Sequence, residues 1–372
     1  MARGRRDGVL IAGGGVAGCL AALALARRRP EVPLLIVEEK DRFGGDGFQY
    51  LFDSELDAKA RAPLAPIAGK SWPGFYVAFP GANRKLKARL AGFDPDALHQ
   101  AMMATLKPDQ YRLGTRVVAV REDALELADG ETVRAVGAID ARGPANLSML
   151  ELLYETRVER LIRLTAPHGL DRPLLVDANV EQNIGFSFIQ AFPVGEDRLR
   201  VAKVLVSERS APDEVADARL DSYLAWRGWR TAEVEARGRR SRPMPIGGDF
   251  NAFWRIGGAR VAKIGLRGGF LQPASGRTVA DAARNAALLA EQEAFGGAAL
   301  HDLFEGEAKR LWKQRELERG INAALAGTAL DRRRAVYERL YQLDAGAILG
   351  FLAGRPGLLD RRRIQQAIKA QA

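Results

Sequence analysis

Cysteine and histidine are scarce in this sequence of 372 residues, which has one cysteine, Cys19, and three histidines. A single thiol excludes an internal disulfide and any cysteine-built zinc or iron–sulfur site, and it is typical of a protein kept in a reducing cytoplasm. Three histidines also argue against a histidine-rich metal site. We therefore expect no metal centre and a cytoplasmic location.

An excess of positive charge is missing from most of the chain, although the net charge is +10. Residues 1–308 contain 42 Lys and Arg against 40 Asp and Glu, whereas residues 309–372 contain 14 against 6. This basic segment has the apolar repeat of helices, and two interpretations stay open. One is an apolar face flanked by arginines that binds an anionic membrane surface; the other, favoured by the pattern alone, is a core-facing helix with a solvated basic side. The residues of that face are Ile348, Leu349, Phe351 and Leu352. Nucleic acid binding is not expected, because interleaved aromatic residues and known binding motifs are missing.

An uncharged run of 18 residues, 9–26, lies near the start of the chain. Arginines precede it, so an export signal or a membrane span has to be considered. Its glycine-rich centre argues against both, because three consecutive glycines weaken a helix. Residues 8–12 instead predict a short strand, 13–18 form the pattern GxGxxG, and 19–29 predict a helix. Gly13 allows a tight turn, Gly15 lets the backbone approach a pyrophosphate, and Gly18 lets the helix pack on the strand.

An acidic residue follows at the position that this motif requires. Residues 33–37 predict a second buried strand, and Glu38 comes directly after it, twenty residues past Gly18. A carboxylate there accepts hydrogen bonds from the ribose hydroxyls of an adenine dinucleotide. The order of strand, glycines, helix, strand and acid therefore predicts dinucleotide binding, with a glycine-rich turn that binds nothing as the alternative.

Three later segments favour FAD over NAD. Residues 42–47 form a glycine-rich loop that contains Gly44 and Gly45, as in flavin domains of the glutathione-reductase type. Residues 132–143 predict a strand that closes on a turn of small residues, or an ordinary strand and hairpin. Residues 261–276 predict a strand and a glycine-rich turn before a helix, whose N-terminus suits a flavin or its phosphates. Flavin hydroxylases have Gly-Asp at this turn, whereas Leu266 follows Gly265 here, which argues against a hydroxylase.

With these motifs the chain resembles the bacterial lycopene β-cyclases, the flavoproteins that form carotenoid rings, over most of its length. The matching segments are residues 11–18, 42–45, 71–86, 138–143, 166–194, 265–276 and 333–363. The sequences PHGL, VDANVEQ and GLRGG are the family-specific ones; the first glycine motif is not.

The resemblance implies an α/β fold with a glutathione-reductase-like (Rossmann) FAD domain, a mixed-sheet substrate domain and a C-terminal helical segment. The FAD domain would comprise residues 1–65, 95–150 and 255–300, the substrate domain 66–94 and 151–254, and the basic helical segment 301–372. FAD is the implied cofactor, with NAD(P)H as a possible reductant. The expected cofactor-binding residues are Gly13, Gly15, Gly18, Glu38, Gly44, Gly45, Asp140, Gly265, Arg267, Gly268, Gly269, Pro273 and Gly276.

The implied reaction converts the linear ends of lycopene to β-rings without net redox change, by a protein peripheral to the inner face of the cell membrane. An acid kept protonated in a dry pocket starts such a cyclisation, a carbocation forms, and a base removes a proton. The resemblance puts the family's Glu at Ala202, beside Lys203, so the acid is missing there. Strand alternation places Ala202 and Lys203 on opposite faces.

Three of the remaining carboxyls are candidates to replace this acid. Asp177, in an apolar run, is the leading candidate, although a hydrogen-bonded Asp at a strand end is the ordinary interpretation; Glu181 and Glu208 are most simply solvated. His168 is a candidate for relaying a proton, or else an imidazole that holds a loop through backbone bonds.

Aromatic residues are candidates for a polyene tunnel, although alternating aromatics also pack sheet cores. They are Phe186, Phe188, Phe192, Trp226, Trp229, Phe253 and Trp254. Two other functions stay open: an FAD-dependent oxidoreductase or monooxygenase on another apolar substrate, and a non-catalytic relative of the cyclases.

Overall fold

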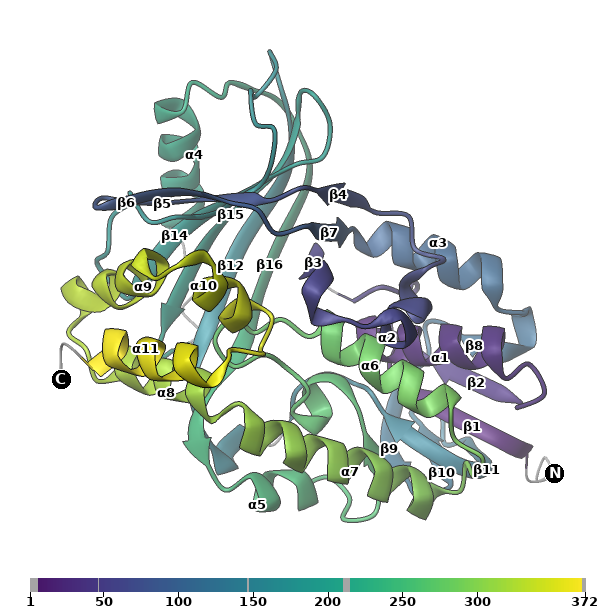
Figure 1. The fold of residues 1–372 in the computed structure, drawn as a ribbon. Helices are drawn as coiled ribbons and strands as arrows, with labels where there is room; N and C mark the ends of the chain where they lie inside the picture. Colours follow the sequence, from purple (N-terminus) through teal and green to yellow (C-terminus); the bar gives the residue numbers. More distant parts are fainter. Residues whose placement is uncertain (1–5, 46, 146, 210–214, 370–372) are drawn as a thin grey trace.

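The structure is a computed structural model that describes residues 6–45, 47–145, 147–209 and 215–369. Two large β-sheets lie in separate halves of the molecule, and a small sheet and helices join them (Figure 1). The N-terminal strand belongs to one half, and the last helices pack on the other.

The first sheet has a parallel core with strand order β8-β2-β1-β11, extended by an antiparallel pair. Its parallel strands are β1 (Arg6–Ala12), β2 (Leu34–Val37), β8 (Tyr111–Arg112), β11 (Thr132–Asp140) and β17 (Ala262–Lys263), which pairs with β11. Strands β9 (Val117–Arg121) and β10 (Ala124–Leu127) form the antiparallel extension. Apolar residues occupy both faces of β1 and β2, as expected for parallel strands that are covered on both sides.

Helices cover one face of this sheet. They are α1 (Val16–Arg28), α2 (Ala58–Arg61), α3 (Pro95–Thr105), α5 (Phe250–Arg255), α6 (Val279–Ala290) and α7 (Gly297–Gln314). Residues 16–25 of α1 are all buried, because the helix lies between β1, α3 and α6. The first turn of α1 has no acidic residue, and Arg27 and Arg28 stand in its last turn, where they complement the helix dipole. The first turn of α1 itself therefore adds no acidic side chain to the N-terminus of the helix. The predicted Rossmann-like α/β fold is confirmed in this half.

The second sheet has the strand order β16-β12-β15-β14-β13-β5-β6. Its strands are β5 (Phe75–Phe79), β6 (Ala82–Leu86), β12 (Leu150–Leu164), β13 (Leu174–Asp177), β14 (Phe186–Pro193), β15 (Arg198–Ser207) and β16 (Thr231–Gly248). One face, here called the outer face, packs on α4 (Ala216–Trp226). The opposite, inner face packs on the C-terminal helices.

The small sheet joins the halves through β3 (Gln49–Phe52), β7 (Leu90–Phe93) and β4 (Lys70–Trp72). Strand β3 pairs with β7, so the expected boundary at residue 65 separates two hydrogen-bonded strands. The division into domains stays a prediction. Short 3-10 helices occur at η1 (Asp53–Glu55), η2 (Ala62–Leu64), η3 (Pro108–Gln110), η4 (Leu147–Met149), η5 (Gly265–Gly268) and η6 (Leu330–Arg332).

Four helices form the C-terminal segment: α8 (Glu316–Ala326), α9 (Arg333–Gln342), α10 (Ala345–Leu352) and α11 (Leu358–Lys369). Ile348, Phe351 and Leu352 are buried against the second sheet and Leu349 is partly buried, which confirms the core-facing interpretation for α10. The exposed apolar pair lies on α11 instead, where Leu358 is 84% and Leu359 69% accessible. Within the described residues, no helix combines the length and the apolar character that crossing a bilayer requires.

Candidate active site

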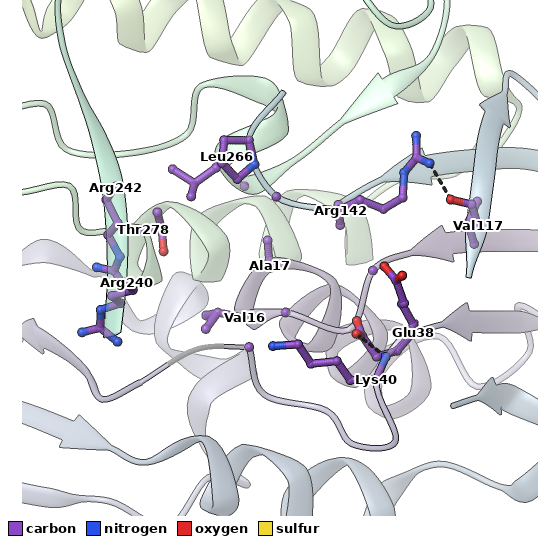
Figure 2. Close-up of a pocket in the computed structure, with 18 of the residues that line it drawn as sticks. Val16, Ala17, Glu38, Lys40, Val117, Arg142, Arg240, Arg242, Leu266 and Thr278 are labelled. Carbon is purple, nitrogen blue, oxygen red and sulfur yellow. Dashed lines mark hydrogen bonds between the residues drawn. The ribbon is translucent and has the colours of Figure 1, made fainter. Parts of the chain in front are cut away.

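A long cleft lies between the first sheet and the edge of the second, with a volume of about 310 Å³. Figure 2 shows Glu38, Lys40 and Arg142 toward one end, the start of α1 with Val16 and Ala17 in the middle, and Arg240, Arg242 and Thr278 at the other end. The remaining lining residues are Gly13, Gly15, Val37, Glu39, Gly45, Gln49, Thr115, Val117, Ala141, Gly143, Pro144, Ser241, Gly265 and Leu266. This shape suits an extended ligand better than a compact one.

The three glycines of the first motif differ in their surroundings. Gly13 has φ +104°, and a Cβ there would lie 2.7 Å from the Ala141 carbonyl oxygen. A Cβ on Gly18 would lie 1.9 Å from the Gly13 carbonyl oxygen, so the helix can only pack this closely on a glycine. A Cβ on Gly15 would meet nothing within 4 Å. Because Gly15 lines the cleft at the N-terminus of α1, its open surroundings and the positive end of the helix dipole fit a diphosphate.

Glu38 marks one end of the cleft, directly after β2. Its Oε1 accepts a hydrogen bond of 2.9 Å from the Lys40 N–H, and its Oε2 accepts one from the Gly14 N–H. These bonds hold the carboxylate at the cleft wall, in reach of a ribose placed beside the glycine turn. The geometry therefore fits a dinucleotide whose adenosine half lies at Glu38.

The glycines and the proline of the two later predicted turns differ in whether they line the cleft. Gly44 donates to the Gly14 carbonyl oxygen at 2.9 Å and approaches Pro95 closely, and Gly45 next to it does line the cleft. Gly265 lines the cleft with φ +62°. The others stand in the second glycine turn or just after it and are absent from the cleft wall: Gly268, Gly269, Pro273 and Gly276.

Asp140 and Arg267, two of the predicted cofactor-binding residues, lie next to each other and do not line the cleft. Asp140 is 1% accessible; it accepts hydrogen bonds of 2.9 and 2.8 Å from the Arg142 guanidinium, and Arg267 lies 3.4 Å away. Arg142 also donates to the Val117 carbonyl oxygen at 2.8 Å and lines the cleft. Asp140 therefore positions Arg142, a cleft residue that the sequence did not single out.

The end of the cleft opposite Glu38 carries arginines from β16. Arg242 donates to the Gln49 Oε1 at 3.3 Å and to the Gly276 carbonyl oxygen at 3.4 Å. Burial and the neighbouring guanidiniums of Arg242 and Arg157 lower the pKa of Arg240 to about 9. Their alternation along one strand was visible in the sequence, but the face that they occupy depends on pairing with β12, where Arg240 lies opposite Arg157 and Arg242 opposite Glu155.

The inner face of the second sheet carries a buried charge cluster next to this end. Its members are Glu155, Arg157, Glu159, Arg200, Arg240 and Arg242. Glu159 accepts a hydrogen bond of 3.2 Å from the Phe48 N–H and lies 3.3 Å from Arg240 and 3.6 Å from Arg200. Burial opposes ionisation of Glu159, but these guanidiniums and that of Arg157 hold its pKa below the usual range. Glu159 is thus a fixed carboxylate.

A second, smaller space of about 50 Å³, here called the aromatic chamber, lies between the inner face and α9. Its aromatic lining is Tyr50, Phe52, Phe186, Phe188, Tyr337 and Tyr341, and its other lining residues are Glu155, Leu175, Val176, Gln190, Val206, Ala274, Ser275, Arg277 and Leu352. Phe186 stacks on Tyr337 with ring centroids 4.5 Å apart, and Tyr337 donates to the Ala274 carbonyl oxygen at 3.1 Å.

The chamber and the cleft share a wall at the β16 end. Gln49 lines the cleft and Tyr50 lines the chamber, while Ser275 and Arg277 of the chamber flank Gly276. Arg242, bonded to Gln49 and Gly276, completes this wall. A ligand lying along the cleft from Glu38 would therefore end next to the chamber.

The aromatic tunnel of the sequence prediction is only partly assembled. Phe186 and Phe188 line the chamber, and Phe192 lies on the same inner face. Trp229 packs on the outer face and Trp226 is 66% accessible, whereas Phe253 and Trp254 belong to the core of the first half. Alternating aromatics in the sequence did not reveal which sheet face they occupy.

Asp177, the leading candidate for the replacement acid, has its side chain on the outer face. Its Oδ2 accepts a hydrogen bond of 2.7 Å from the Tyr223 hydroxyl on α4, and its Oδ1 accepts bonds from Asn179 at 3.0 and 3.1 Å. Burial and this carboxylate raise the pKa of Tyr223. Asp177 is thus the hydrogen-bonded strand-end Asp, and it does not face the chamber.

His168 holds a loop through both ring nitrogens. Its Nδ1 accepts a hydrogen bond of 3.0 Å from the Leu170 N–H, so Nε2 carries the proton and donates to the Gly195 carbonyl oxygen at 2.7 Å. Its imidazole is therefore used for structure, away from the cleft and the chamber. Glu181 pairs with Arg219 at 3.0 Å, and Glu208 with Arg333.

Ala202 lies on the inner face, between Glu159 of β12 and Gln190 of β14 in the strand register. It is 3% accessible and belongs to the inner-face core. Lys203 follows on the opposite face, as alternation requires.

The architecture is that of the Rossmann-like FAD-dependent enzymes. It resembles 2-methyl-3-hydroxypyridine-5-carboxylic acid oxygenase with a TM-score of 0.65 at 16% identity, over 86% of this chain and 92% of the other. A geranylgeranyl bacteriochlorophyll reductase-like protein from Thermoplasma acidophilum gives 0.63 at 15% identity, over 99% and 96%. At these identities the likeness concerns the fold alone.

The chain belongs to the lycopene cyclase protein family, whose profile matches residues 8–369. It is 31% identical over 366 residues to a lycopene beta-cyclase of Pseudescherichia vulneris, covering 96% of this chain and 93% of the relative. Lycopene beta-cyclases of Paracoccus sp. and Pantoea ananas are 30% and 28% identical, again over 96% of this chain and over 92% and 93% of the relatives. The family expected from the sequence motifs is confirmed.

Proposed function

We propose that this protein is an FAD-binding carotenoid cyclase that converts the linear ends of lycopene to β-rings, an isomerisation without net redox change. Family membership supports the reaction class. The observation that carries the proposal is the shared wall of Gln49, Gly276 and Arg242, which joins a dinucleotide cleft to an aromatic chamber.

FAD fits the cleft from end to end. Glu38 would bind the adenosine ribose, and the backbone at Gly15 and the start of α1 would bind the diphosphate. Gln49, Arg242 and Thr278 would surround the flavin ring at the far end. When bound there, a reduced flavin supplies an electron-rich surface that stabilises positive charge nearby.

The chamber supplies what a carbocation needs. Aromatic faces attract positive charge, and a site that excludes water keeps a carbocation from being quenched. Tyr337 and Tyr341 of α9 close the chamber on one side, opposite Phe186 and Phe188 of β14. The aromatic and aliphatic side chains of this lining suit a hydrocarbon chain end, and its polar side chains offer a few fixed groups beside it.

The test uses FAD-loaded protein, reduced with dithionite, and lycopene in lipid vesicles. Conversion to products of unchanged mass that contain β-rings is expected. Oxygenated products, or NADPH oxidation stimulated by an apolar substrate, would instead identify a monooxygenase or oxidoreductase. Tight FAD and lycopene binding with no product would identify a non-catalytic relative.

NAD(P)H is proposed as the reductant of the flavin. A second opening shares Lys40, Gly45 and Arg240 with the cleft, and Arg42, Arg200, Arg237 and Arg239 make its lining basic overall although Asp94, Asp96 and Glu159 also line it. Such an opening attracts a phosphorylated dinucleotide. Anaerobic bleaching of bound flavin by NADPH is the expected result, and an unchanged flavin spectrum would remove this part of the proposal.

Peripheral membrane binding, at the inner face of the cell membrane, is proposed for α11. Leu358 and Leu359 are exposed at its start, and Arg361, Arg362 and Arg363 follow. Exposed apolar residues next to arginines suit an anionic bilayer surface. The protein should sediment with phosphatidylglycerol vesicles more than with phosphatidylcholine vesicles, and Leu358→Ser with Leu359→Ser should reduce this. Equal sedimentation of the wild type and the double serine variant with phosphatidylglycerol vesicles would contradict membrane binding through α11.

A further inference from the structure

The chamber contains a carboxyl that the sequence did not single out. Glu155 lies on β12, 5% accessible, and it is the one acidic side chain among the described residues that line the chamber. The lining around it is mainly aromatic and aliphatic, together with Gln190, Ser275 and the guanidinium of Arg277, and Arg157 forms an ion pair of 3.3 Å with Glu155. A buried carboxyl in such surroundings needs an explanation, because burying it costs free energy.

The hydrogen bonds of Glu155 leave one oxygen available. Arg157 approaches only Oε1, at 3.4 Å from Nε and 3.3 Å from Nη2, and makes a shorter bond of 2.8 Å to the Gln190 side chain. Oε2 of Glu155 has no hydrogen-bond partner among the described residues. This oxygen is therefore free to meet a ligand in the chamber.

Glu155 also lies at the boundary between chamber and cleft. Its partner in the β12–β16 register is Arg242, which forms the shared wall. The carboxyl is thus close to both the ligand of the chamber and the flavin end of the cleft.

Glu159 cannot take this role, although it is the cross-strand neighbour of Ala202. Glu159 lines the basic second opening instead of the chamber, so it cannot reach a ligand there, and both of its oxygens are engaged, by the Phe48 N–H and by Arg240 and Arg200.

We propose that Glu155 is the catalytic acid and base of the cyclisation, in place of the acid that the resemblance puts at Ala202; this rests on the proposed function. The Glu155 carboxyl gives its proton to the CH carbon of the end double bond, whose π electrons form the new C–H bond and leave the positive charge on the carbon that carries the two methyl groups. The tertiary cation is attacked by an internal double bond, which forms the ring C–C bond and moves the charge into the ring. The Glu155 carboxylate then removes a ring proton, whose C–H electrons form the ring double bond. The acid is restored, and the product is an isomer of the substrate, so no oxidant or reductant is consumed.

The first test compares Glu155→Gln, Glu155→Asp and the matched control Asp177→Asn, all loaded with FAD. Glu155→Gln should lose at least about 100-fold in ring formation, the scale of a general acid, and keep the wild-type FAD affinity within about threefold. Glu155→Asp should keep measurable ring formation, because it retains a proton donor on a shorter arm. Asp177→Asn, on the outer face, should form rings at nearly the wild-type rate. Ring formation by Glu155→Gln at the wild-type rate would overturn the proposal, and equal loss in the Gln and Asp variants would do the same.

The second test does not depend on turnover. A cyclic isoprenoid amine that carries its charge at the ring cation position should bind the wild-type chamber at least about tenfold more tightly than the matched hydrocarbon. Glu155→Gln should abolish this preference. If the wild type forms no rings but still binds the amine more tightly than the hydrocarbon, the proposed reaction is contradicted, whereas the proposed binding site for a cation beside Glu155 is supported. If wild type and Glu155→Gln bind both compounds alike, Glu155 has no part in the chamber's chemistry.

Discussion

Replacing Gly15 by alanine is expected to weaken FAD binding and leave the fold intact. The backbone at Gly15 has φ −72° and ψ −176°, which alanine adopts without strain, and no atom lies within 4 Å of the added Cβ. Alanine in place of glycine stabilises the folded protein by about 0.4–1 kcal/mol, because it lowers the conformational entropy of the unfolded chain. Alanine is also a poorer helix N-cap than glycine, by a similar free energy. The free energy of unfolding should therefore change by less than about 1 kcal/mol. The methyl group would occupy the space proposed for the diphosphate, so FAD affinity should fall at least about tenfold, or about 1.4 kcal/mol.

Gly18→Ala is the matched comparison from the same motif. Its Cβ would overlap the Gly13 carbonyl oxygen at 1.9 Å, and overpacking of this kind costs about 1–3 kcal/mol. Urea unfolding of the apoproteins measures stability, and quenching of flavin fluorescence measures affinity. Wild-type FAD affinity in Gly15→Ala would refute the placement of the diphosphate, and a stable Gly18→Ala protein would refute the packing argument.

Three further substitutions or treatments test the described contacts. Asp281 is buried between guanidiniums and accepts hydrogen bonds of 2.6 and 2.7 Å from Arg315. Burial alone would raise the pKa of Asp281, but these guanidiniums hold it well below the usual range. Asp281→Asn should cost about 3–5 kcal/mol at pH 7; because the folded pKa is depressed, this penalty should persist above pH 4 and shrink as the pH falls further, which urea unfolding at each pH checks. Tyr223→Phe leaves the buried Asp177 Oδ2 without its donor, so it should cost about 1–3 kcal/mol in the same assay and leave FAD affinity unchanged. Burial raises the pKa of Cys19, so iodoacetamide at pH 8 should modify this thiol only in unfolded protein, as mass spectrometry will show.

The parts of the site that follow local rules could be predicted from the sequence. Gly13, Gly15 and Gly18 and the following Glu38 depend on a turn, a helix and the next strand, which are all close in sequence. Their positions relative to one another follow from strand and helix geometry alone.

The parts that depend on distant strand pairing could not be predicted. The register between β12 and β16 brings Glu155 opposite Arg242, and neither residue has a local signal for that contact. The position of Asp177 could not be predicted for a related reason. In a sheet that is buried on both sides, an apolar run of residues does not indicate on which face a given side chain lies. The opposite faces of Ala202 and Lys203 could be predicted, because alternation along a strand does not depend on which strands it pairs with.

Ring formation from lycopene in D₂O tests the central claim most directly. FAD-loaded, dithionite-reduced protein should yield β-rings that each carry one deuterium in place of one hydrogen, because an acid in exchange with solvent starts the reaction and a base removes a substrate proton. Mass spectrometry of the product measures this. A product without deuterium, or one that has gained oxygen, would contradict acid-initiated cyclisation by this protein.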